Sequence, residues 1–254
     1  GIQACPMPTA VLTSQTGFKS FYCNDCTDKL DYYTSEWKKL GFQPDGIYTG
    51  FLSSEKQVDK ILEFINSFEN ENTLVLVDPV MGDGGRTYSL FTDALACKMK
   101  KLVTVADVIT PNLTECCILC DVDYCKFIKN ADKPDFLDKI AELGKNLLNR
   151  YGVKIVIITG IEHKDIDGTM YVQNLIASKD EVFSVSCKKI GGSYSGTGDL
   201  FASVMFSGLL RGDTLRDTVS LAVKFIETSL RDTVALGIDR NEGIEFEKHL
   251  KILL

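Results

Sequence analysis

The sequence has few histidines, no excess of basic residues and no long apolar run. Its 35 acidic residues outnumber 28 basic ones, and the net charge of −7 argues against nucleic acid as the main partner, because phosphate backbones recruit Lys and Arg in excess. Apolar runs fall well short of the roughly 20 residues that a membrane-spanning helix needs, and no signal peptide is visible. The two histidines suggest no Ser/His/Asp or Cys/His arrangement for nucleophilic catalysis.

Hydrophobic residues make up 44% of the 254 positions, which suits one compact domain over residues 1–254. The nine cysteines are an odd number in a chain with a normal core, and they predict reduced thiols in a cytoplasmic protein. Cys23–Cys26 and Cys117–Cys120 have the CxxC spacing of metal and redox sites. A zinc site would need the two pairs to converge, whereas small apolar core residues give this spacing by chance.

Segments with strand and helix character alternate along the chain. Thr73–Val77 is a continuous apolar run typical of a strand buried on both faces, and Ser54–Phe68 places its apolar residues on one face of a helix. The alternation predicts an α/β fold in which helices cover both faces of a mainly parallel sheet. We expect strands at 45–51, 73–77, 105–109, 153–158, 170–177 and 182–188, and helices at 54–68, 136–148, 200–210 and 215–230.

Small and polar residues stand where four of these strands end. They are Thr49-Gly50, Asp78-Pro79, Thr110-Pro111 and Thr159-Gly160. Ligands of parallel α/β sheets bind beyond the carboxyl ends of the strands. The pattern therefore predicts a binding site at that edge of the sheet.

The strongest chemical signal is Gly191–Phe201, GGSYSGTGDLF, a glycine-rich loop that leads into an apolar helix. Glycines let backbone N–H groups turn toward a ligand, and a helix N-terminus adds partial positive charge. The loop is therefore suited to hold a transferring phosphoryl group. Asp199, where the helix begins, can accept a proton from an attacking hydroxyl.

Asp199 has a second interpretation as a simple helix N-cap. The glycines on both sides of it favour the chemical role, because capping does not require them. The loop lacks the Gly-Lys-Ser/Thr ending of a Walker A motif, and its place late in the chain is unlike that of the dinucleotide fingerprint.

Two further segments carry carboxylates to strand ends. In Asp78–Asp83 (DPVMGD) two carboxylates on a turn can hold Mg²⁺ through water, although Asp-Pro and Gly-Asp are also ordinary turn residues. In Ile109–Glu115 (ITPNLTE), Asn112 and Glu115 can form a capping arrangement for the next helix. As a site, the same segment offers Asn112 to phosphate and Glu115 to the metal.

The segments DPVMGD, ITPNLTE, VIITG and SGTGDLF occur in the order found in the ribokinase superfamily. The chain resembles its pyridoxal kinase branch, especially the bacterial pyridoxal/pyridoxamine kinases, through GIQACPMPTAVLTSQTGF, WKKLGFQPDGIYTGFLSSEKQ and VLVDPVMGD. The resemblance covers essentially the whole chain. It implies a ribokinase-like three-layer α/β/α kinase domain that phosphorylates the 5′-hydroxymethyl group of pyridoxal, pyridoxamine or pyridoxine with ATP and forms a homodimer.

The resemblance also implies a role for individual residues. Asp199 would take the hydroxyl proton, while Gly196, Thr197 and Gly198 hold the migrating phosphoryl group. Mg²⁺ would accompany ATP, and a monovalent cation such as K⁺ would assist. The implied nucleotide and phosphate residues are Asp78, Thr110, Asn112, Thr159 and Gly160, the metal residues are Asp83 and Glu115, and the residues beside the pyridine ring are Thr16 and Phe51.

The chain departs from that pattern in two places. Relatives have a strand and a helix before the segment that matches Gly1, so we expect the first strand and helix to be missing here and the substrate site to be incomplete. Phe51 stands where relatives often have Tyr, which removes one hydroxyl from the substrate pocket.

Three alternatives remain open. Hydroxymethylpyrimidine kinases share the fold and phosphorylate a similar hydroxymethyl group, but many carry Cys at or near the position of Asp199. A non-catalytic nucleotide or vitamer-binding protein on the same scaffold would have no need of that aspartate. A cysteine-based metal or redox module would rest on the CxxC spacings alone.

Overall fold

The computed structural model describes residues 1–88, 91–131 and 133–254. Its centre is a six-stranded sheet with the order β10-β9-β8-β7-β4-β3. Strands β3, β4, β7 and β8 run parallel, and β9 runs antiparallel to both of its neighbours, so β10 again points the same way as β8. The strands are β3 (Gly46–Thr49), β4 (Leu74–Val77), β7 (Val108–Ile109), β8 (Ile155–Lys164), β9 (Met170–Ser178) and β10 (Val182–Lys188).

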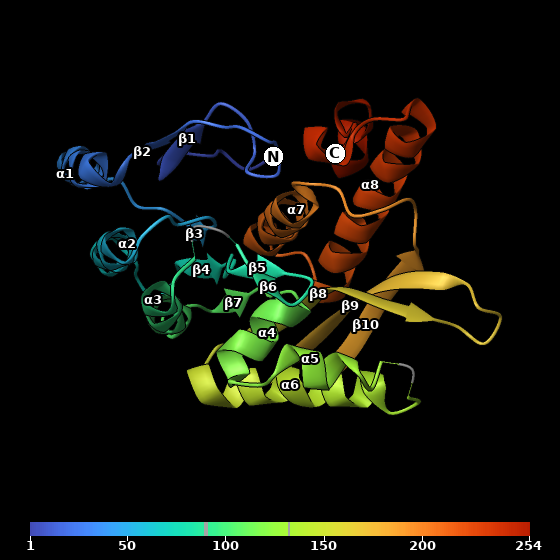
Figure 1. Cartoon of the computed structure of the whole chain (residues 1–254). Coiled ribbons are helices and arrows are strands. Elements are labelled where there is room, and N and C mark those ends of the chain that lie inside the picture. Colours follow the sequence, from blue (N-terminus) through green and yellow to red (C-terminus); the bar gives the residue numbers. More distant parts are fainter. Residues whose placement is uncertain (89–90, 132) are drawn as a thin grey trace.

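Helices form a layer on each side of this sheet (Figure 1). Helices α7 (Thr197–Arg211) and α8 (Leu215–Leu236) cover one face, while α4 to α6 cover the other and α1 to α3 flank the β3 end. This arrangement confirms the predicted three-layer α/β fold. The remaining helices are α1 (Leu30–Lys39), α2 (Glu55–Phe68), α3 (Asp93–Val103), α4 (Leu113–Cys120), α5 (Tyr124–Ile128) and α6 (Phe136–Tyr151).

Strand β4 shows why the sheet is held in the middle of the molecule. Leu76 packs into the apolar cluster formed with α7 and α8, whereas Val75 and Val77 pack into the cluster on the opposite side. All three side chains are at most 2% exposed. Burying such a side chain contributes about 1.5–3 kcal/mol, so an apolar residue at every position stabilises both layers.

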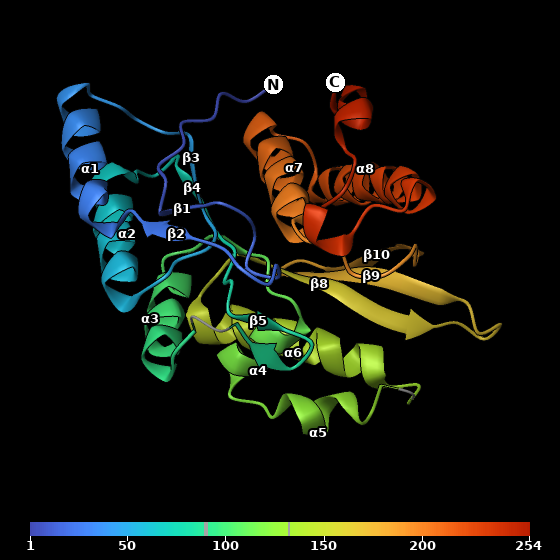
Figure 2. The same cartoon turned by 45° about the horizontal axis from the view of Figure 1, so that its top comes forward.

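Two short hairpins stand apart from the central sheet. One pairs β1 (Ala10–Leu12) with β2 (Cys23–Asp25), and the other pairs β5 (Gly82–Asp83) with β6 (Arg86–Thr87). In Figure 2 the loop between β1 and β2 extends toward the middle of the molecule. The described part of the chain also includes the 3-10 segments η1 (Thr27–Lys29), η2 (Arg240–Glu242) and η3 (Glu247–Leu253).

Several predicted boundaries were wrong, and two of them lie at the carboxyl edge of the sheet or at the glycine-rich loop. The strand expected to end at Thr159-Gly160 continues to Lys164, and a β-bulge between Ile158 and Ile161 lies where the end was expected. Gly160 has a φ of +69°, which lets the chain bulge there without side-chain strain. Helix α7 begins at Thr197, before the expected residue 200, because Gly196 takes a left-handed conformation and ends the loop.

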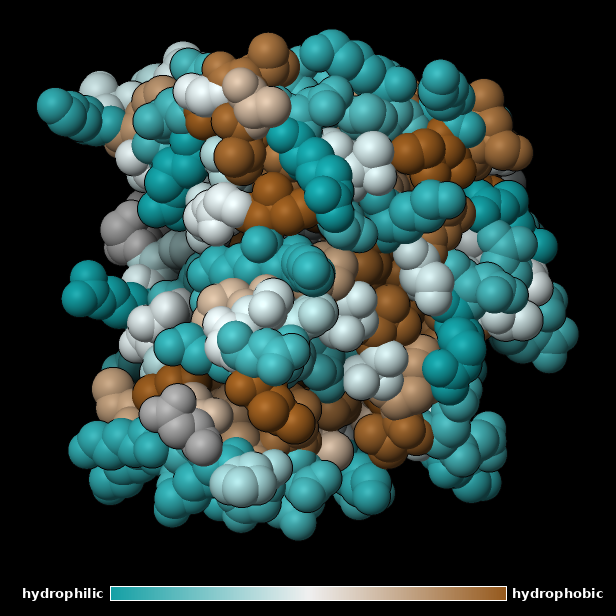
Figure 3. All heavy atoms as spheres, turned by 90° about the vertical axis from the view of Figure 1, so that its right-hand side faces the viewer, coloured by the Kyte–Doolittle hydropathy of each residue, from teal (hydrophilic) through white to brown (hydrophobic). Residues whose placement is uncertain are grey.

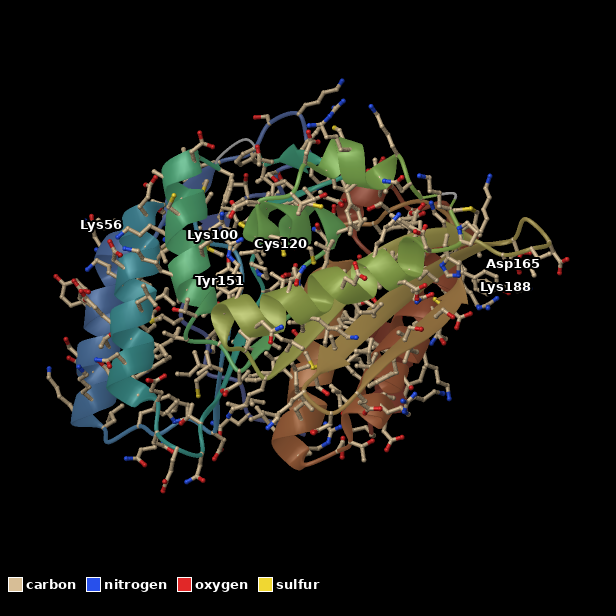
Figure 4. All side chains as sticks on the ribbon, turned by 90° about the horizontal axis from the view of Figure 1, so that it is seen from below. Lys56, Lys100, Cys120, Tyr151, Asp165 and Lys188 are labelled. Atoms are coloured by element: carbon tan, nitrogen blue, oxygen red, sulfur yellow. The ribbon has the colours of Figure 1, made fainter. Side chains whose placement is uncertain are left out.

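The nine cysteines are free thiols. Cys117 is buried in α4, and this burial raises its pKa to about 11, which keeps the thiol protonated near neutral pH. Figure 4 shows Cys120 near Lys100 and Tyr151 on the underside of the molecule, whereas Lys188 lies beside the β8–β9 hairpin. The buried thiols of α4, Cys116 and Cys117, therefore behave as packing residues.

The side of the molecule that carries α8 and the β8–β9 hairpin mixes hydrophilic and hydrophobic side chains (Figure 3). Exposed apolar residues include Ile166 at the hairpin tip and Leu236 at the end of α8. Single exposed apolar residues of this kind are normal on a protein surface. Within the part of the chain that the structure describes, no helix is both long and apolar enough to span a membrane.

Candidate active site

A large cavity lies at the carboxyl edge of the sheet. Its volume of about 1530 Å³ exceeds the range of about 300–1,000 Å³ that is usual for one small ligand, so it has room for two. Residues from the β1–β2 loop, the strand ends, α4, the glycine-rich loop and α8 all contribute to its wall. Every residue assigned to a site from the sequence lines it: Thr16, Phe51, Asp78, Asp83, Thr110, Asn112, Glu115, Thr159, Gly160, Gly196, Thr197, Gly198 and Asp199.

Asp78 stands directly after β4 at the bottom of this cavity. Its backbone N–H donates to the Thr49 carbonyl at 2.9 Å, which continues the pairing between β4 and β3. The side chain is 8% exposed. Burial and the nearby charge of Asp199 raise the pKa of Asp78 to about 7. The nearby hydroxyl of Thr110 opposes this rise in pKa, although it forms no hydrogen bond of normal geometry.

The N-terminus of α7 faces the same space. Gly196 is the N-cap residue with a φ of +80°, and Asp199 lies in the first turn, so the alternative interpretation of Asp199 as the N-cap is wrong. A side-chain carbon added at Gly196 or Gly198 would meet no atom within 4 Å. The first N–H groups of a helix have no partner within the helix, so this turn offers donors and open space to an anion.

Asp199 is exposed to the cavity, and protein surrounds it on its other sides. This surrounding protein raises the pKa of Asp199 above its usual value, since it displaces part of the water that would solvate the charge. A carboxylate with a raised pKa is a stronger base than an ordinary surface aspartate. Its position between the helix N-terminus and Asp78 allows it to receive a proton inside the cavity.

The predicted capping arrangement is present at the start of α4. The Asn112 side chain accepts from the Glu115 N–H at 3.1 Å, and Glu115 Oε2 accepts from the Asn112 N–H at 2.8 Å. Asn112 Nδ2 donates to the Gly82 carbonyl, and Glu115 Oε1 accepts from the Met81 N–H at 3.0 Å. Both side chains therefore fasten the 78–85 segment to α4, which leaves them less free to bind phosphate or metal directly.

Glu115 is 3% exposed, and burial together with the charge of Asp78 raises its pKa well above the usual value. The backbone donors that it accepts from oppose this rise. Asp83, by contrast, is exposed in the β5–β6 hairpin, where its Oδ1 accepts from the Gly84 N–H at 2.8 Å. Of the two predicted metal residues, Asp83 is thus the more accessible.

The ends of β7 and β8, where nucleotide-binding residues are predicted, are joined across the sheet. Thr159 forms a parallel bridge with Asn112, and its N–H donates to the Pro111 carbonyl at 2.9 Å. The Gly160 N–H donates to Asn174 Oδ1 at 3.3 Å. The bulge at Gly160 therefore opens the edge of β8 toward the cavity while its backbone remains anchored.

On the opposite side of the cavity lie Phe51 and the β1–β2 loop with Thr16. The Thr9 hydroxyl donates to the Phe51 carbonyl at 2.9 Å, which attaches the segment before β1 to the segment after β3. Thr16 is exposed at the cavity wall. These two predicted substrate residues thus lie on the β3 side of the cavity, away from the end of β8.

Sequence reasoning missed several polar residues of the wall, among them Gln15, Lys188, Lys189, Arg240 and Asn241. Lys188 ends β10, which runs in the direction of β8, so it reaches the same edge of the sheet as Asp78. The sequence does contain a signal for this, since two lysines stand one residue before the glycine-rich loop. The contribution of Gln15 and Asn241 depends on contacts between distant parts of the chain and has no local signature.

The donor set fits Mg²⁺ bound together with phosphates. Within residues 1–88, 91–131 and 133–254, no three His, Cys, Asp or Glu side chains are grouped to hold a metal by themselves. Mg²⁺ does not require such a group, because it usually keeps several waters and uses one or two carboxylates plus substrate phosphates. Asp78 and Asp83 could supply those carboxylates, and a cation there would offset the repulsion between Asp78 and Asp199. The monovalent cation implied by the resemblance stays a prediction.

Comparison with known sequences gives one family. A profile described as phosphomethylpyrimidine kinase matches residues 35–243. The pyridoxal kinase of Arabidopsis thaliana is 29% identical over 195 residues, which cover 74% of this chain and 58% of that protein. A hydroxymethylpyrimidine/phosphomethylpyrimidine kinase of Staphylococcus aureus is 26% identical over 198 residues, which cover 78% of this chain and 66% of that protein. The chain spans 57–64% of the length of three curated pyridoxal kinase relatives.

Solved structures agree with this fold. A protein of Bacteroides thetaiotaomicron, described as a phosphomethylpyrimidine kinase and crystallised with pyridoxal, superposes with a TM-score of 0.90 at 37% identity. The match covers 100% of this chain and 86% of that one. The pyridoxal kinase of Lactobacillus plantarum superposes with a TM-score of 0.82 at 24% identity, covering 98% and 84% of the two chains, and this likeness concerns the fold alone.

Proposed function

This chain belongs to the phosphomethylpyrimidine kinase family, and from that membership we propose that it transfers the γ-phosphoryl group of ATP to the 5′-hydroxymethyl group of a B6 vitamer. The observation that carries the proposal is the placement of Asp199 in the first turn of α7, open to a cavity that has room for two ligands. Family membership supports the kinase class, and the geometry of the cavity supports the assignment of roles below.

Asp199 acts as the general base. It accepts the proton of the vitamer hydroxyl while that oxygen attacks the γ-phosphorus, and the bond from phosphorus to the β,γ-bridging oxygen of ATP breaks. The raised pKa of Asp199 brings its basicity closer to neutral pH, which favours proton transfer. General base catalysis of this kind contributes about 10² to 10⁴ in rate.

The N–H groups at the start of α7 hold the transferring phosphoryl group. Gly196, Thr197 and Gly198 form this turn, and the absence of side chains on the two glycines leaves space for the phosphoryl oxygens. Phosphoryl transfer needs positioning and charge stabilisation more than covalent chemistry, so fixed donors at this point suit the reaction.

The other carboxylates bind and position. Asp78 and Asp83 would hold Mg²⁺ through water, and that ion when bound would neutralise charge on the ATP phosphates. Glu115 and Asn112 keep the 78–85 segment against α4, so they place Asp78 and Asp83 correctly. Thr110, Thr159 and Gly160 form the wall at the strand ends beside the nucleotide, while Thr16 and Phe51 face the vitamer.

Pyridoxal is the acceptor that similarity favours. The Bacteroides thetaiotaomicron protein, 37% identical to this chain, was crystallised with pyridoxal. Curated pyridoxal kinases are 26–29% identical to this chain. The Asp at position 199 also favours this acceptor over hydroxymethylpyrimidine. The relatives that act on hydroxymethylpyrimidine make that ring the second candidate. Homodimer formation and a cytoplasmic location are further proposals.

The test is turnover of ATP with pyridoxal, pyridoxamine, pyridoxine and hydroxymethylpyrimidine, for the wild type and for Asp199→Asn. We expect turnover with at least one B6 vitamer and a loss in kcat of about 10² to 10⁴ in Asp199→Asn, with a smaller change in ATP affinity. Asp138→Asn, on the exposed face of α6, is the matched control and should keep wild-type turnover.

Near-wild-type kcat in Asp199→Asn would refute the assignment of the base. Preference for hydroxymethylpyrimidine would show that this ring, the second candidate, is the acceptor. Binding of ATP without consumption, whichever acceptor is added, would indicate a non-catalytic binding protein on the kinase scaffold.

A further inference from the structure

Two side chains that are 226 positions apart in the sequence meet at the cavity. Gln15 Nε2, in the β1–β2 loop, donates to Asn241 Oδ1, in η2, at 2.8 Å. Both residues line the cavity, on the side of the vitamer residues. Figure 2 shows the β1–β2 loop extending toward the segment that follows α8. We call this contact the Gln15–Asn241 latch.

Gln15 is fixed at both ends of its amide. Its Oε1 accepts from the Gly17 N–H at 2.7 Å, which leaves Nε2 as the group that donates to Asn241. Thr16 lies between Gln15 and Gly17, so the hydrogen bonds of Gln15 shape the turn that carries Thr16. The latch therefore holds the part of the loop that we place beside the vitamer.

The latch also leaves no space for a side chain at position 17. A carbon added to Gly17 would lie 2.7 Å from Asn241 Oδ1 and 2.7 Å from Gln15 Nε2. Both atoms belong to flexible side chains that can move aside, but they cannot do so and keep their hydrogen bond. Gly17→Ala is therefore expected to open the latch without straining the backbone, since φ of Gly17 is not in the left-handed region.

On its other side the latch connects to the phosphoryl site. Asn241 is held in η2, where its N–H donates to Asp239 Oδ1 at 2.8 Å. The carbonyl of the adjacent Arg240 accepts from the Ser195 N–H at 3.0 Å. Ser195 immediately precedes Gly196, the N-cap residue of α7. The Thr16 turn is thus joined by two hydrogen bonds to the loop that leads to Asp199.

We propose that Gln15 and Asn241 are positioning residues that couple binding of the acceptor to binding of the nucleotide. An acceptor that contacts the Thr16 turn stabilises the latch that this turn already makes, and the latch steadies η2 and the loop before α7, where the phosphoryl group is received. The reverse holds by linkage, because a nucleotide that orders this loop strengthens acceptor binding by the same factor. The inference rests on the proposed kinase function.

The test measures the dissociation constant of pyridoxal by calorimetry, with and without Mg²⁺ and the non-hydrolysable analogue β,γ-methylene ATP. The ratio of the two constants is the coupling factor. One neutral hydrogen bond corresponds to about a 2- to 10-fold change. We therefore expect the wild type to show coupling and Gln15→Ala, Asn241→Leu and Gly17→Ala each to lose about 2- to 10-fold of it, with little change in the affinity for the analogue alone.

Two further variants distinguish coupling from a general structural effect. Asn241→Asp keeps the oxygen that accepts from Gln15 and should retain coupling, while Gln15→Ala combined with Asn241→Leu should lose no more than either single change. Gln3→Ala and Asn66→Ala, both at exposed positions, are the controls and should behave as wild type. Wild-type coupling in the Gln15 and Asn241 variants, or no coupling in the wild type, overturns the latch.

Failure of the proposed function gives a different result. In that case the wild type turns over no ATP with a B6 vitamer, whatever the latch variants do. If the wild type acts on hydroxymethylpyrimidine instead, the same titrations with that ring test the latch.

Discussion

Replacing Asp78 with Asn should make the ligand-free protein more stable at alkaline pH while it removes activity. The side chain of Asp78 is 8% exposed and lies near Asp199, and its pKa is raised from 3.8 to about 7. The folded protein therefore binds this proton more tightly than the unfolded chain does. The stability that the proton supplies is fully present below pH 4 and is lost as the pH rises to about 7.

The size of the effect follows from the two pKa values. A difference of about 3 pKa units, at 1.36 kcal/mol per unit, corresponds to on the order of 4 kcal/mol of unfolding free energy. Asn has nearly the same shape and carries no charge at any pH. The stability of Asp78→Asn relative to wild type should thus grow by up to this amount between pH 4.5 and pH 8.

Urea unfolding of the ligand-free proteins at the two pH values provides the measurement, with Asp138→Asn as the control for loss of an exposed carboxylate. Wild type should also gain stability from Mg²⁺ and ATP at pH 8, and Asp78→Asn should gain less. A stability difference between Asp78→Asn and wild type that is the same at pH 4.5 and pH 8 would refute the reasoning, because it would mean that Asp78 titrates normally.

Two other substitutions separate folding from chemistry. Gly198→Ala should leave the unfolding temperature unchanged or slightly higher, since Ala favours a helix and its Cβ meets no atom within 4 Å. The same change should lower kcat at least about tenfold, because the methyl group fills the space assigned to the phosphoryl group. Normal turnover would contradict the assigned role of this turn. Asn112→Ala removes the α4 cap and should cost about 1 kcal/mol, or about 2–4 °C in calorimetry, whereas an unchanged transition would mean that the cap is dispensable.

The fold and the family were predictable because their signals are local in the sequence. The apolar runs of β4 and β8 fix the buried strands, and the order of DPVMGD, ITPNLTE and GTGD identifies the superfamily, a resemblance that the comparisons confirm. The polar residues at the strand ends also converge at one cavity as expected. Their roles in binding and catalysis stay predictions until they are tested by substitution.

Other features could not be read from local patterns. The direction of β9 depends on its hairpin with β8, and the bulge at Gly160 depends on pairing with β9, so a strand end and a bulge look alike in the sequence. The partners of Glu115 include the Met81 N–H, 34 positions away. Capping and the predicted metal binding would use the same carboxylate of Glu115, and only the three-dimensional contacts show how its oxygens are occupied.

The meeting of residues 15 and 241 has a consequence for the order of folding. Joining points 226 residues apart in a flexible chain costs about 3 kcal/mol more entropy than joining points 10 residues apart. A single neutral hydrogen bond contributes only about 1 kcal/mol, so it cannot form until the intervening sheet has brought its ends together. Ribosomal synthesis also makes Asn241 long after Gln15. We expect that wall of the cavity to be completed last, after the protein is otherwise folded.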